Sequence, residues 1–469
     1  MEECGLKILF VHLILGDPKL MLNYSLGITS MAAVLKQAEH RISYLPIMAP
    51  EYLRKDSEIK NQTEKRIEDF KPDIIGISST SDCFIAAERV IHHINRRFPG
   101  LFIIVGGVHA TSVPDSVMKI KGVSGICLGE GEHALLELLE RVRDRQNYLG
   151  VKNFWFKNKK KIIKNPQRDL IHNLDELPFE DLDIIDENRL ITLNRMNENI
   201  IFPQLGSVGQ ADIMASRGCE GNCSYCFNSV AKRLYKNERI FCRRHSVRYV
   251  IEQIKLIKKR YKMFKIHFWD DAFVDDIEWL RLFSRMYYKE IRMPFRCLVR
   301  PNLTKEKIRL LKAAGCNTIN IGVECGNDYI RNRILNRPWT KEQILRSCAL
   351  IKDYKILLYV FSMVGCPGEN KSTLEETYNL IKEIKPDSSD HCSIFKPYPG
   401  TRSYFLCKQK GWIAKRRFFG YFIDSQLNLP GLSRIAIKKY QLKIRALSED
   451  IFSIIKLRID NEKKGLVYP

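Results

Sequence analysis

Short apolar runs alternate with amphipathic segments along most of the 469 residues, and this alternation constrains the fold more than any other feature. Strands that are apolar throughout and separated by helices are typical of a parallel sheet that is covered on both faces. In the first 150 residues, the expected strands are 7–15, 41–48, 73–79, 101–107 and 124–132, and the expected helices are 27–40, 84–98 and 133–144. This region predicts an α/β fold with a Rossmann-like, doubly wound parallel sheet.

A second alternation begins near residue 210. Its expected strands are 211–215, 264–269, 295–299, 318–323, 358–364 and 391–395, and its expected helices are 247–260, 277–289, 304–314, 341–353 and 372–384. Six β/α units are too few to close an eight-stranded barrel. We therefore expect a partial (β/α)6 TIM-like barrel in this half of the chain.

The two alternations divide the chain into four expected parts. These are an N-terminal domain at 1–150, a linker at 151–205, a second domain at 206–400 and a small, mostly helical C-terminal region at 401–469. The last part carries 15 Lys and Arg against 5 Asp and Glu. Its basic residues alternate with Ile, Leu and Tyr, which predicts an amphipathic helix over 434–458 rather than a nucleic-acid-binding tail.

Composition narrows the class of protein further. The formal net charge of +23 suggests an anionic partner but does not identify one. The 14 Cys show no disulfide-scaffold spacing, no 18 apolar residues run together, and the N-terminal apolar run resembles a strand rather than a signal peptide. We expect a cytoplasmic protein in a reducing compartment, without a membrane span.

A cluster of three cysteines is the strongest chemical signal. Cys219, Cys223 and Cys226 follow the strand 211–215 as C-x3-C-x2-C within SRGCEGNCSYCFNS, between glycines that allow a tight loop. Three thiolates on one loop suit three corners of an iron–sulfur cluster and leave one iron without a protein ligand. Zinc coordination and unligated core cysteines are the alternatives, but no fourth ligand stands at zinc-ribbon spacing.

This loop, with Tyr225 as its aromatic residue, resembles the signature of the radical S-adenosylmethionine (SAM) superfamily, and the resemblance covers about 206–400. The segments FWDDAF (268–273), IGVECG (321–326), MVGCPGE (363–369) and KPYPGT (396–401) extend it. The resemblance implies that the three cysteines hold a [4Fe–4S] cluster whose open iron binds SAM. It also implies SAM contacts at Asp270, Asp271, Glu324, Gly365 and Pro367. A helix N-cap, a buried ion pair and ordinary turns are the structural alternatives for these residues.

Small residues follow the strands of the first domain, where ligands of such sheets bind. They allow a large planar ligand to approach the backbone closely. The pattern PDIIGISS…FPGLFIIVGGVHAT…GICLGEGEHALLELL resembles the cobalamin-binding domain that precedes many radical SAM cores, over about 1–140. The cobalamin contacts that this resemblance implies are Ser78, Ser79, Thr80, Gly106, Gly107, His109, Gly129, Glu130, Gly131 and Glu132.

The alternatives for this domain are phosphate binding by the same glycines and a docking role without a ligand. No G-x-G-x-x-G follows the first strand, which disfavours the phosphate site. No D-x-H-x-x-G motif is present, so no histidine from that motif would ligate cobalt from below. For His109, a local hydrogen bond is the alternative to a cobalamin contact.

Together the resemblances imply an enzyme that generates a 5′-deoxyadenosyl radical from SAM and methylates an unactivated carbon through methylcobalamin. The alternatives are a non-methylating oxidoreductase or cyclase with the same cofactors, a tRNA methylthiotransferase and a non-catalytic cobalamin or redox sensor. The sequence nominates no catalytic acid, base or nucleophile. The expected partners are a small-molecule or peptide substrate of unknown identity and a low-potential reductant such as flavodoxin or ferredoxin.

Overall fold

The computed structural model describes residues 5–15, 24–49, 56–185, 210–415 and 422–448, except Asn237, Arg239, Lys262, Phe264 and Ala272. Two compact units make up the chain. The first comprises residues 1–192, 226–243 and 398–401, and the second comprises residues 193–225, 244–397 and 402–469. The domain and linker boundaries expected from the sequence remain predictions.

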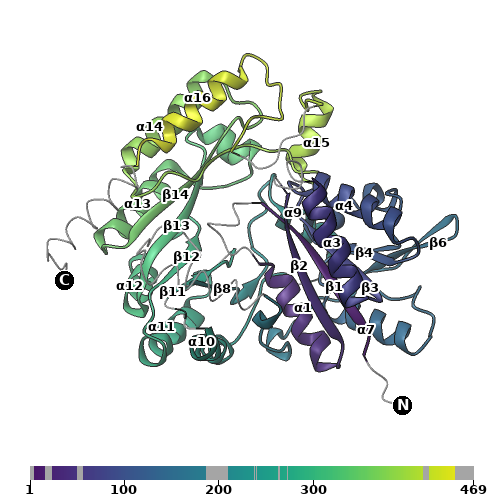
Figure 1. Ribbon diagram of the computed structural model, residues 1–469. Helices are drawn as coiled ribbons and strands as arrows, with labels where there is room; N and C mark the ends of the chain where they lie inside the picture. The colour runs from purple at the N-terminus through teal and green to yellow at the C-terminus, as the bar shows by residue number, and fades with distance from the viewer. Residues whose placement is uncertain are drawn as a thin grey trace. The chain divides into compact units, whose positions relative to one another are not determined.

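A seven-stranded sheet forms the centre of the first unit (Figure 1). Its order is β2 (Arg41–Met48), β1 (Lys7–Ile14), β3 (Ile74–Ser79), β4 (Phe102–Gly106), β5 (Gly125–Cys127), β6 (Phe154–Asn158) and β7 (Lys161–Lys164). The first five strands are parallel, and β6 and β7 continue the sheet antiparallel. The predicted Rossmann-like sheet is therefore confirmed.

Helices connect the parallel strands of this sheet. They are α1 (Leu26–Gln37), α3 (Asp56–Phe70), α4 (Phe84–Arg97), α5 (Val108–Ser112), α6 (Pro114–Met118) and α7 (Glu132–Arg143). Ile28 and Leu35 of α1 pack with Leu135 and Leu138 of α7 against Phe10, and all five side chains are buried. The apolar alternation thus produces a buried layer between the sheet and this pair of helices.

Three features of the first unit differ from the expectation. The segment 154–164 lies within the predicted linker, but it forms a hairpin because Phe154 and Phe156 stack and bury themselves while the lysines occupy the turn. The helix α3 escaped prediction because its sequence is mostly polar. The expected strand 124–132 ends at Cys127, where the turn before α7 begins.

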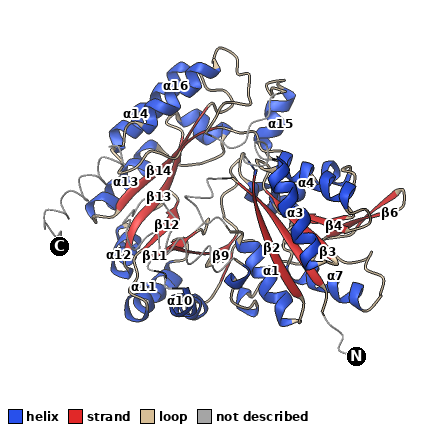
Figure 2. Cartoon of the chain, viewed as in Figure 1, coloured by secondary structure: helices blue, strands red, loops and turns tan. Residues whose placement is uncertain are grey.

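A curled sheet of six parallel strands forms the second unit. Its order is β15 (Cys392–Ile394), β14 (Leu357–Val364), β13 (Cys316–Glu324), β12 (Phe295–Val299), β11 (Lys265–Phe268) and β8 (Gln210–Ile213). The connecting helices are α10 (Val247–Tyr261), α11 (Ile277–Glu290), α12 (Lys305–Ala314), α13 (Lys341–Asp353) and α14 (Lys371–Ile384). They lie along the convex face of the strands (Figure 1, Figure 2). The predicted partial barrel is confirmed.

The convex face owes its stability to buried aromatic side chains. Phe268 of β11 contacts Phe273, Phe283 and Phe295 edge-on or tilted, with ring centroids 4.6, 5.5 and 5.4 Å away. Aromatic pairs at these separations add to the stability gained from burial. The carboxyl ends of the strands above this core are thereby held in fixed positions.

The C-terminal region contains α15 (Arg402–Gln409) and α16 (Arg434–Arg445). The helix expected over 434–458 ends at Arg445, and residues 449–458 of that prediction lie outside the described residues. In the described parts of the chain, no helix is long and apolar enough to cross a bilayer.

Candidate functional site

The cysteine loop follows β8 at the carboxyl edge of the half-barrel. Gly218 adopts a positive φ of 88°, a conformation that glycine accepts without steric cost. A Cβ on Gly221 would stand 3.3 Å from the Cys219 sulfur and 3.8 Å from the Cys223 sulfur. A side chain there would therefore crowd the space between the two thiols. All three cysteines are half-buried, and none of the three forms a disulfide.

A turn after β13 fixes the backbone of this loop. The π-helical turn Ile330–Ile334 leads into residues 334–337. Ser224 donates its backbone N–H to the Leu335 carbonyl at 2.9 Å and its hydroxyl to the Ile334 carbonyl at 2.6 Å. The Asn336 side chain donates to the Asn222 carbonyl at 2.6 Å. Two segments more than 100 residues apart in sequence are thus joined by three hydrogen bonds.

Arg337 lies at the centre of a polar network beside the loop. Its guanidinium donates to the Gly322 carbonyl at 2.7 Å and the Tyr225 hydroxyl at 3.3 Å, and it approaches the Cys223 sulfur at 3.7 Å. The Glu324 carboxylate is 3.6 Å away. Burial lowers the pKa of Arg337, but Tyr225, Glu324 and Cys223 outweigh burial, so the pKa is raised and the charge is retained.

Glu324 ends β13 in an unusual backbone conformation. Its φ is 66°, and the register between β13 and β14 shifts between Gly322 and Glu324. Such strain in a residue other than glycine is often found at functional sites. Burial raises the pKa of the carboxyl group, while Arg337 and a hydrogen bond with Tyr225 oppose the rise. The strained backbone and the cation together direct a carboxylate toward the cysteine loop.

The two aspartates predicted as SAM contacts have different surroundings. Asp270 is fully buried and accepts hydrogen bonds from the Ala215 N–H, at 3.0 Å, and from the Ser216 hydroxyl. Burial raises its pKa to about 6 despite these bonds. Asp271 is exposed, and its charge is close enough to raise the pKa of Cys219. Asp270 therefore supports the strand that leads into the loop, whereas Asp271 faces the loop itself.

Gly365 and Pro367 lie in the turn after β14, and both are buried. A Cβ on Gly365 would meet the Ile437 side chain of α16 at 3.2 Å. The buried Glu369 closes this turn by accepting from the Cys366 N–H at 2.8 Å and from the Cys325 thiol at 3.5 Å. Burial raises the pKa of Glu369 to about 7. The turn thus connects the ends of β13 and β14.

The carboxyl edge of the first sheet is built from small residues. Thr80 and Gly107 are exposed, Ser78 and Gly106 are half-buried, and Ser79 is buried. Gly107 has a φ of 88°, and a Cβ there would stand 3.1 Å from the Ser78 hydroxyl. A cavity of about 50 Å³ lies beneath this rim, between Ser78, Gly106 and the neighbouring side chains. The edge offers a bare backbone surface rather than charged groups.

The charged residues predicted at this edge are engaged within the first unit. Glu130 pairs with Arg243 at 2.9 Å and accepts the Ile171 N–H at 3.0 Å. Glu132 is buried and accepts from the Ser30 hydroxyl at 2.8 Å. The neighbouring glycines pack closely as well, because a Cβ on Gly129 or Gly131 would collide with Tyr235 or Met31, respectively.

His109 has a local structural environment. It is buried, hydrogen-bonds to the Ser81 hydroxyl through Nδ1 at 3.0 Å and stacks on Phe84 with ring centroids 3.8 Å apart. These contacts match the local alternative considered for this residue. They orient α5, which follows Gly107.

Sequence reasoning missed three arginines near the cysteine loop. Arg300 lies close to Gly221 and pairs with Asp275. Arg331 is fully buried and donates to the Cys325 and Trp339 carbonyls, each at 2.7 Å. Arg337 binds the loop directly. Arginines between apolar segments ordinarily indicate a solvated surface, so no sequence signal distinguished them.

Within the described residues, no three His, Cys, Asp or Glu side chains converge on a point where one metal ion would bind. A single zinc ion ordinarily takes four protein ligands that converge on one point. A [4Fe–4S] cluster has a different geometry, because each thiolate binds a separate iron. The spaced thiols and the side-chain-free position at Gly221 fit a cluster of that kind.

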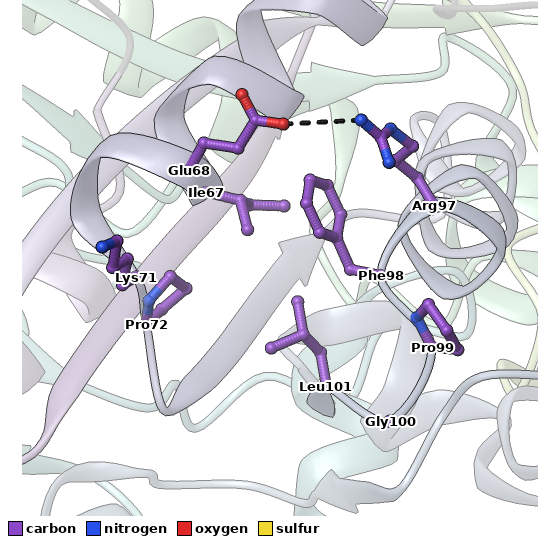
Figure 3. Close-up of a pocket in the computed structure, with 9 residues that line it drawn as sticks. All are labelled: Ile67, Glu68, Lys71, Pro72, Arg97, Phe98, Pro99, Gly100 and Leu101. Carbon is purple, nitrogen blue, oxygen red and sulfur yellow. Dashed lines mark ion pairs between the residues drawn. The ribbon is translucent and has the colours of Figure 1, made fainter.

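A larger hollow lies elsewhere on the first unit (Figure 3). It measures about 680 Å³ and is lined by the ends of α3 and α4, where Glu68 and Arg97 form an ion pair at 3.6 Å. This hollow lies at the amino ends of β3 and β4, since Pro72 and Leu101 immediately precede those strands. It is therefore separate from the edge formed by Ser78 and Gly107.

Two family models match the chain. The model described as the radical SAM superfamily matches residues 213–381, and the model described as a B12 binding domain matches residues 21–139. The second domain is therefore a radical SAM domain. The chain thus combines a B12-binding domain with a radical SAM domain, and its cofactors are a [4Fe–4S] cluster, SAM and cobalamin.

Three related proteins align with most of this chain. An uncharacterized methyltransferase of Pyrococcus horikoshii is 24% identical over 456 residues, which cover 94% of this chain and 93% of that protein. An anaerobic magnesium-protoporphyrin IX monomethyl ester cyclase of Rubrivivax gelatinosus is 23% identical, over 72% of this chain and 59% of its own length. The radical SAM methyltransferase TsrM of Kitasatospora setae shares the fold, with a TM-score of 0.66 and 14% identity over 94% of this chain and 85% of its own.

Proposed function

We propose that the protein is a cobalamin-dependent radical SAM methyltransferase that methylates an unactivated carbon of its substrate. The observation that carries the proposal is the presence, in one chain, of a three-cysteine loop and a B12-binding domain whose sheet edge is bare. The P. horikoshii relative, which aligns over nearly the whole chain, supports methyl transfer. When bound, the cluster and SAM supply reductive radical generation, and cobalamin supplies a methyl group.

Cys219, Cys223 and Cys226 would hold the cluster. The hydrogen bonds from residues 334–337 orient the loop, and Arg337 and Arg300 place positive charge beside its thiolates. Positive charge and N–H donors stabilise thiolate ligands and moderate the negative charge of an iron–sulfur centre. These residues therefore prepare the loop for the cluster.

Glu324 and Asp271 would contact SAM from the carboxyl ends of their strands. Both carboxylates lie near the cysteine loop. Glu324 is 3.6 Å from Arg337, and the charge of Asp271 raises the pKa of Cys219. An ionised carboxylate stabilises the ammonium group of an amino acid by charge-assisted hydrogen bonding. Asp270, Gly365 and Pro367 are buried, so we assign them to holding the surrounding turns, where their backbone groups border the same edge.

Thr80, Gly106, Gly107 and Ser78 would form the cobalamin surface. The missing side chain at Gly107 allows close approach of a large planar ring system. The small cavity next to Ser78, Gly106 and Gly107 leaves space into which these residues can shift when the ligand binds. Glu130, Glu132 and His109 support this surface through the internal contacts described above. Among the described residues of the site we place none as a general acid or base, so we assign these residues to binding, orienting and excluding water.

The experiment is anaerobic reconstitution with iron, sulfide and hydroxocobalamin, followed by desalting and quantification of both bound cofactors. Near-stoichiometric cobalamin together with cluster absorption is expected. A low-potential reductant such as flavodoxin or ferredoxin is then supplied with SAM that carries a deuterated methyl group. Transfer of that label to a product supports the methyltransferase.

Two outcomes would replace the proposal. Cobalamin-dependent turnover without transfer of the label would favour a cyclase or oxidoreductase, as the R. gelatinosus relative suggests. A cluster that forms without any cobalamin binding would exclude the methylcobalamin route. The substrate would then have to be sought among those of other radical SAM enzymes.

A further inference from the structure

The concave face of the half-barrel carries a row of polar side chains. The strand register places Asp212 of β8 beside His267 of β11, and His267 beside Arg296 of β12. Side chains at alternating positions point to opposite faces of a sheet. Neighbouring Ile266 and Phe268 pack into the apolar core on the convex side, so the polar row lies on the concave side.

Hydrogen bonds connect the members of this row. Arg296 Nη2 lies 2.9 Å from His267 Nδ1, which is 3.7 Å from Asp212 Oδ1. Gln210 donates from Nε2 to Asp212 Oδ1 at 2.8 Å. Burial lowers the pKa of His267, with the Arg296 charge adding to this, so the imidazole is neutral. Because Arg296 can only donate, Nδ1 accepts and Nε2 carries the proton.

Two donors of this row lack an acceptor among the described residues. His267 is 0% exposed, yet its Nε2 has no hydrogen-bond partner, and neither has Nε of Arg296. No described carboxylate lies within 4.0 Å of the Arg296 guanidinium, whose one hydrogen bond is to His267. Leaving a buried donor without an acceptor costs about 1–3 kcal/mol, and more for a charged group. The arrangement therefore favours a ligand that brings acceptor atoms.

The surrounding charges favour an anionic ligand. Burial, aided by Arg296, lowers the pKa of Lys265 only to about 8, so its ammonium group is mostly retained at neutral pH. Burial lowers the pKa of His391 to about 4, which leaves it uncharged. Burial raises the pKa of Asp212, the one carboxyl group in this set. Burial lowers the pKa of Arg296, while Asp212 and the phenol of Tyr359 oppose that change. Two cations thus face one carboxyl group.

Apolar side chains occupy several of the next positions toward the cysteine loop, although β13 places Asn320 beside Leu298. Trp269, directly after β11, is 41% exposed and lies over His267 with ring centroids 3.9 Å apart. Leu298 follows Arg296 by two residues on β12, and Phe361 follows Tyr359 by two residues on β14. Both side chains therefore lie on the same concave face. Apolar side chains on both sides of Asn320 therefore lie between the polar row and the carboxyl ends of the strands.

We propose that this concave face binds the anionic group of the substrate, a carboxylate or a phosphonate, through Arg296, Lys265 and His267. The hydrocarbon part of the substrate then lies along Trp269 and Phe361, with its reacting carbon toward the cysteine loop. The orientation of the reacting carbon rests on the proposed function. The binding of the anionic group does not depend on it.

The test is calorimetric titration of the reconstituted holoenzyme with butyrate and with n-propylphosphonate. One or both anions should bind, whereas the neutral isostere butyramide should bind at least about tenfold more weakly, as expected for loss of a charge-assisted hydrogen bond. Arg296→Met should weaken anion binding by about tenfold or more, and Arg296→Lys should restore part of it. Arg309→Met, which alters an exposed arginine of α12, is the matched control and should bind as the wild type does.

Three results would overturn the inference. The first is a wild-type protein that binds neither anion, and the second is equal binding of butyramide. The third is unchanged anion binding by both Arg296 variants. If Arg296→Met does not fold, as judged by circular dichroism, Arg296→Lys and His267→Gln decide the question. Cobalamin content and SAM cleavage are measured separately, so anion binding without cobalamin would contradict the proposed function while this inference stood.

Discussion

The carboxyl edges of the two sheets are built in opposite ways. At the edge of the first sheet, the exposed positions are Gly107 and Thr80, and the nearby carboxylates Glu130 and Glu132 are bonded to other parts of the same unit. At the edge of the half-barrel, charged side chains gather around the cysteine loop, with Arg337 and Glu324 only 3.6 Å apart.

This difference teaches that the two edges select their ligands by different physical effects. A bare backbone selects by shape, because any added atom occupies the space of the ligand. A set of charged side chains selects by electrostatics, because it stabilises particular charges at particular points. Substitutions at the first edge should therefore act through volume, and substitutions at the second through charge.

The largest effect is expected from Cys223→Ala. Removing one of three thiolate ligands should abolish cluster assembly and SAM cleavage, while cobalamin binding by the other edge is retained. Iron content, electron paramagnetic resonance and cobalamin absorbance measure these outcomes. Cys348→Ala, a buried cysteine of α13, is the control and should keep its cluster. Full iron content in the Cys223 variant would show that the loop does not hold the cluster.

Gly107→Val should act next most strongly, through added volume and through backbone strain. A β-branched residue at a φ of 88° is strained by about 1–3 kcal/mol, and its Cβ would crowd the Ser78 hydroxyl. Cobalamin affinity should fall by about tenfold or more, because a loss of about 1.4 kcal/mol in binding free energy weakens affinity tenfold. Iron content should not change. Gly150→Val, at an open position of the same unit, should leave both cofactors bound; equal losses in both variants would contradict the assignment.

Arg337→Gln should sharpen the contrast by removing charge with little change in volume. The N–H···S contact to Cys223 and the positive charge both disappear, so the reduction potential of the cluster should become more negative. Because Glu324 also loses its partner, the KM for SAM should rise. Redox titration monitored by paramagnetic resonance measures the first effect. Arg337→Lys should recover part of it, and Arg333→Gln, an exposed neighbour, should cause none. An unchanged potential would remove Arg337 from the site.

The smallest effect concerns Asp270 and pH. Its folded-state pKa is raised to about 6 from 3.8, so the native state binds this proton more tightly than the unfolded state does. Stability from this group is therefore present below pH 4 and is lost as pH rises through 6, by roughly 3 kcal/mol at most. Asp270→Asn should flatten the fall in melting temperature of the apoprotein between pH 4.5 and 7. Glu369 contributes in the same direction, so part of the fall should persist. An identical slope in the variant would refute this account.

Much of the fold was predictable because apolar periodicity reports burial directly. The expected strand 318–323 appears as β13, Cys316–Glu324, and the expected helix 341–353 appears as α13 with the same bounds. The hairpin of β6 and β7 was missed because its lysines suggested a linker. α3 was missed because its buried positions are few and its surface is polar.

The candidate site was less predictable because it depends on long-range contacts. The cysteine spacing is local, so the loop could be identified from the sequence. Arg337 meets Cys223 only because a turn 114 residues later folds against the loop. Likewise, the segment GEGE (129–132) resembles a ligand-binding turn, yet its Glu130 forms an ion pair with Arg243. No local sequence pattern reveals this partner.

Arg331 has a consequence for how the cluster is acquired. Its buried guanidinium binds the carbonyls of Cys325 and Trp339, which fixes the chain on both sides of the turn that pins Ser224 and Asn222. Much of the cysteine loop's conformational freedom is thus lost when the polypeptide folds, before iron arrives. Assembly of the cluster then requires less additional ordering, which favours tight retention of iron at low concentration.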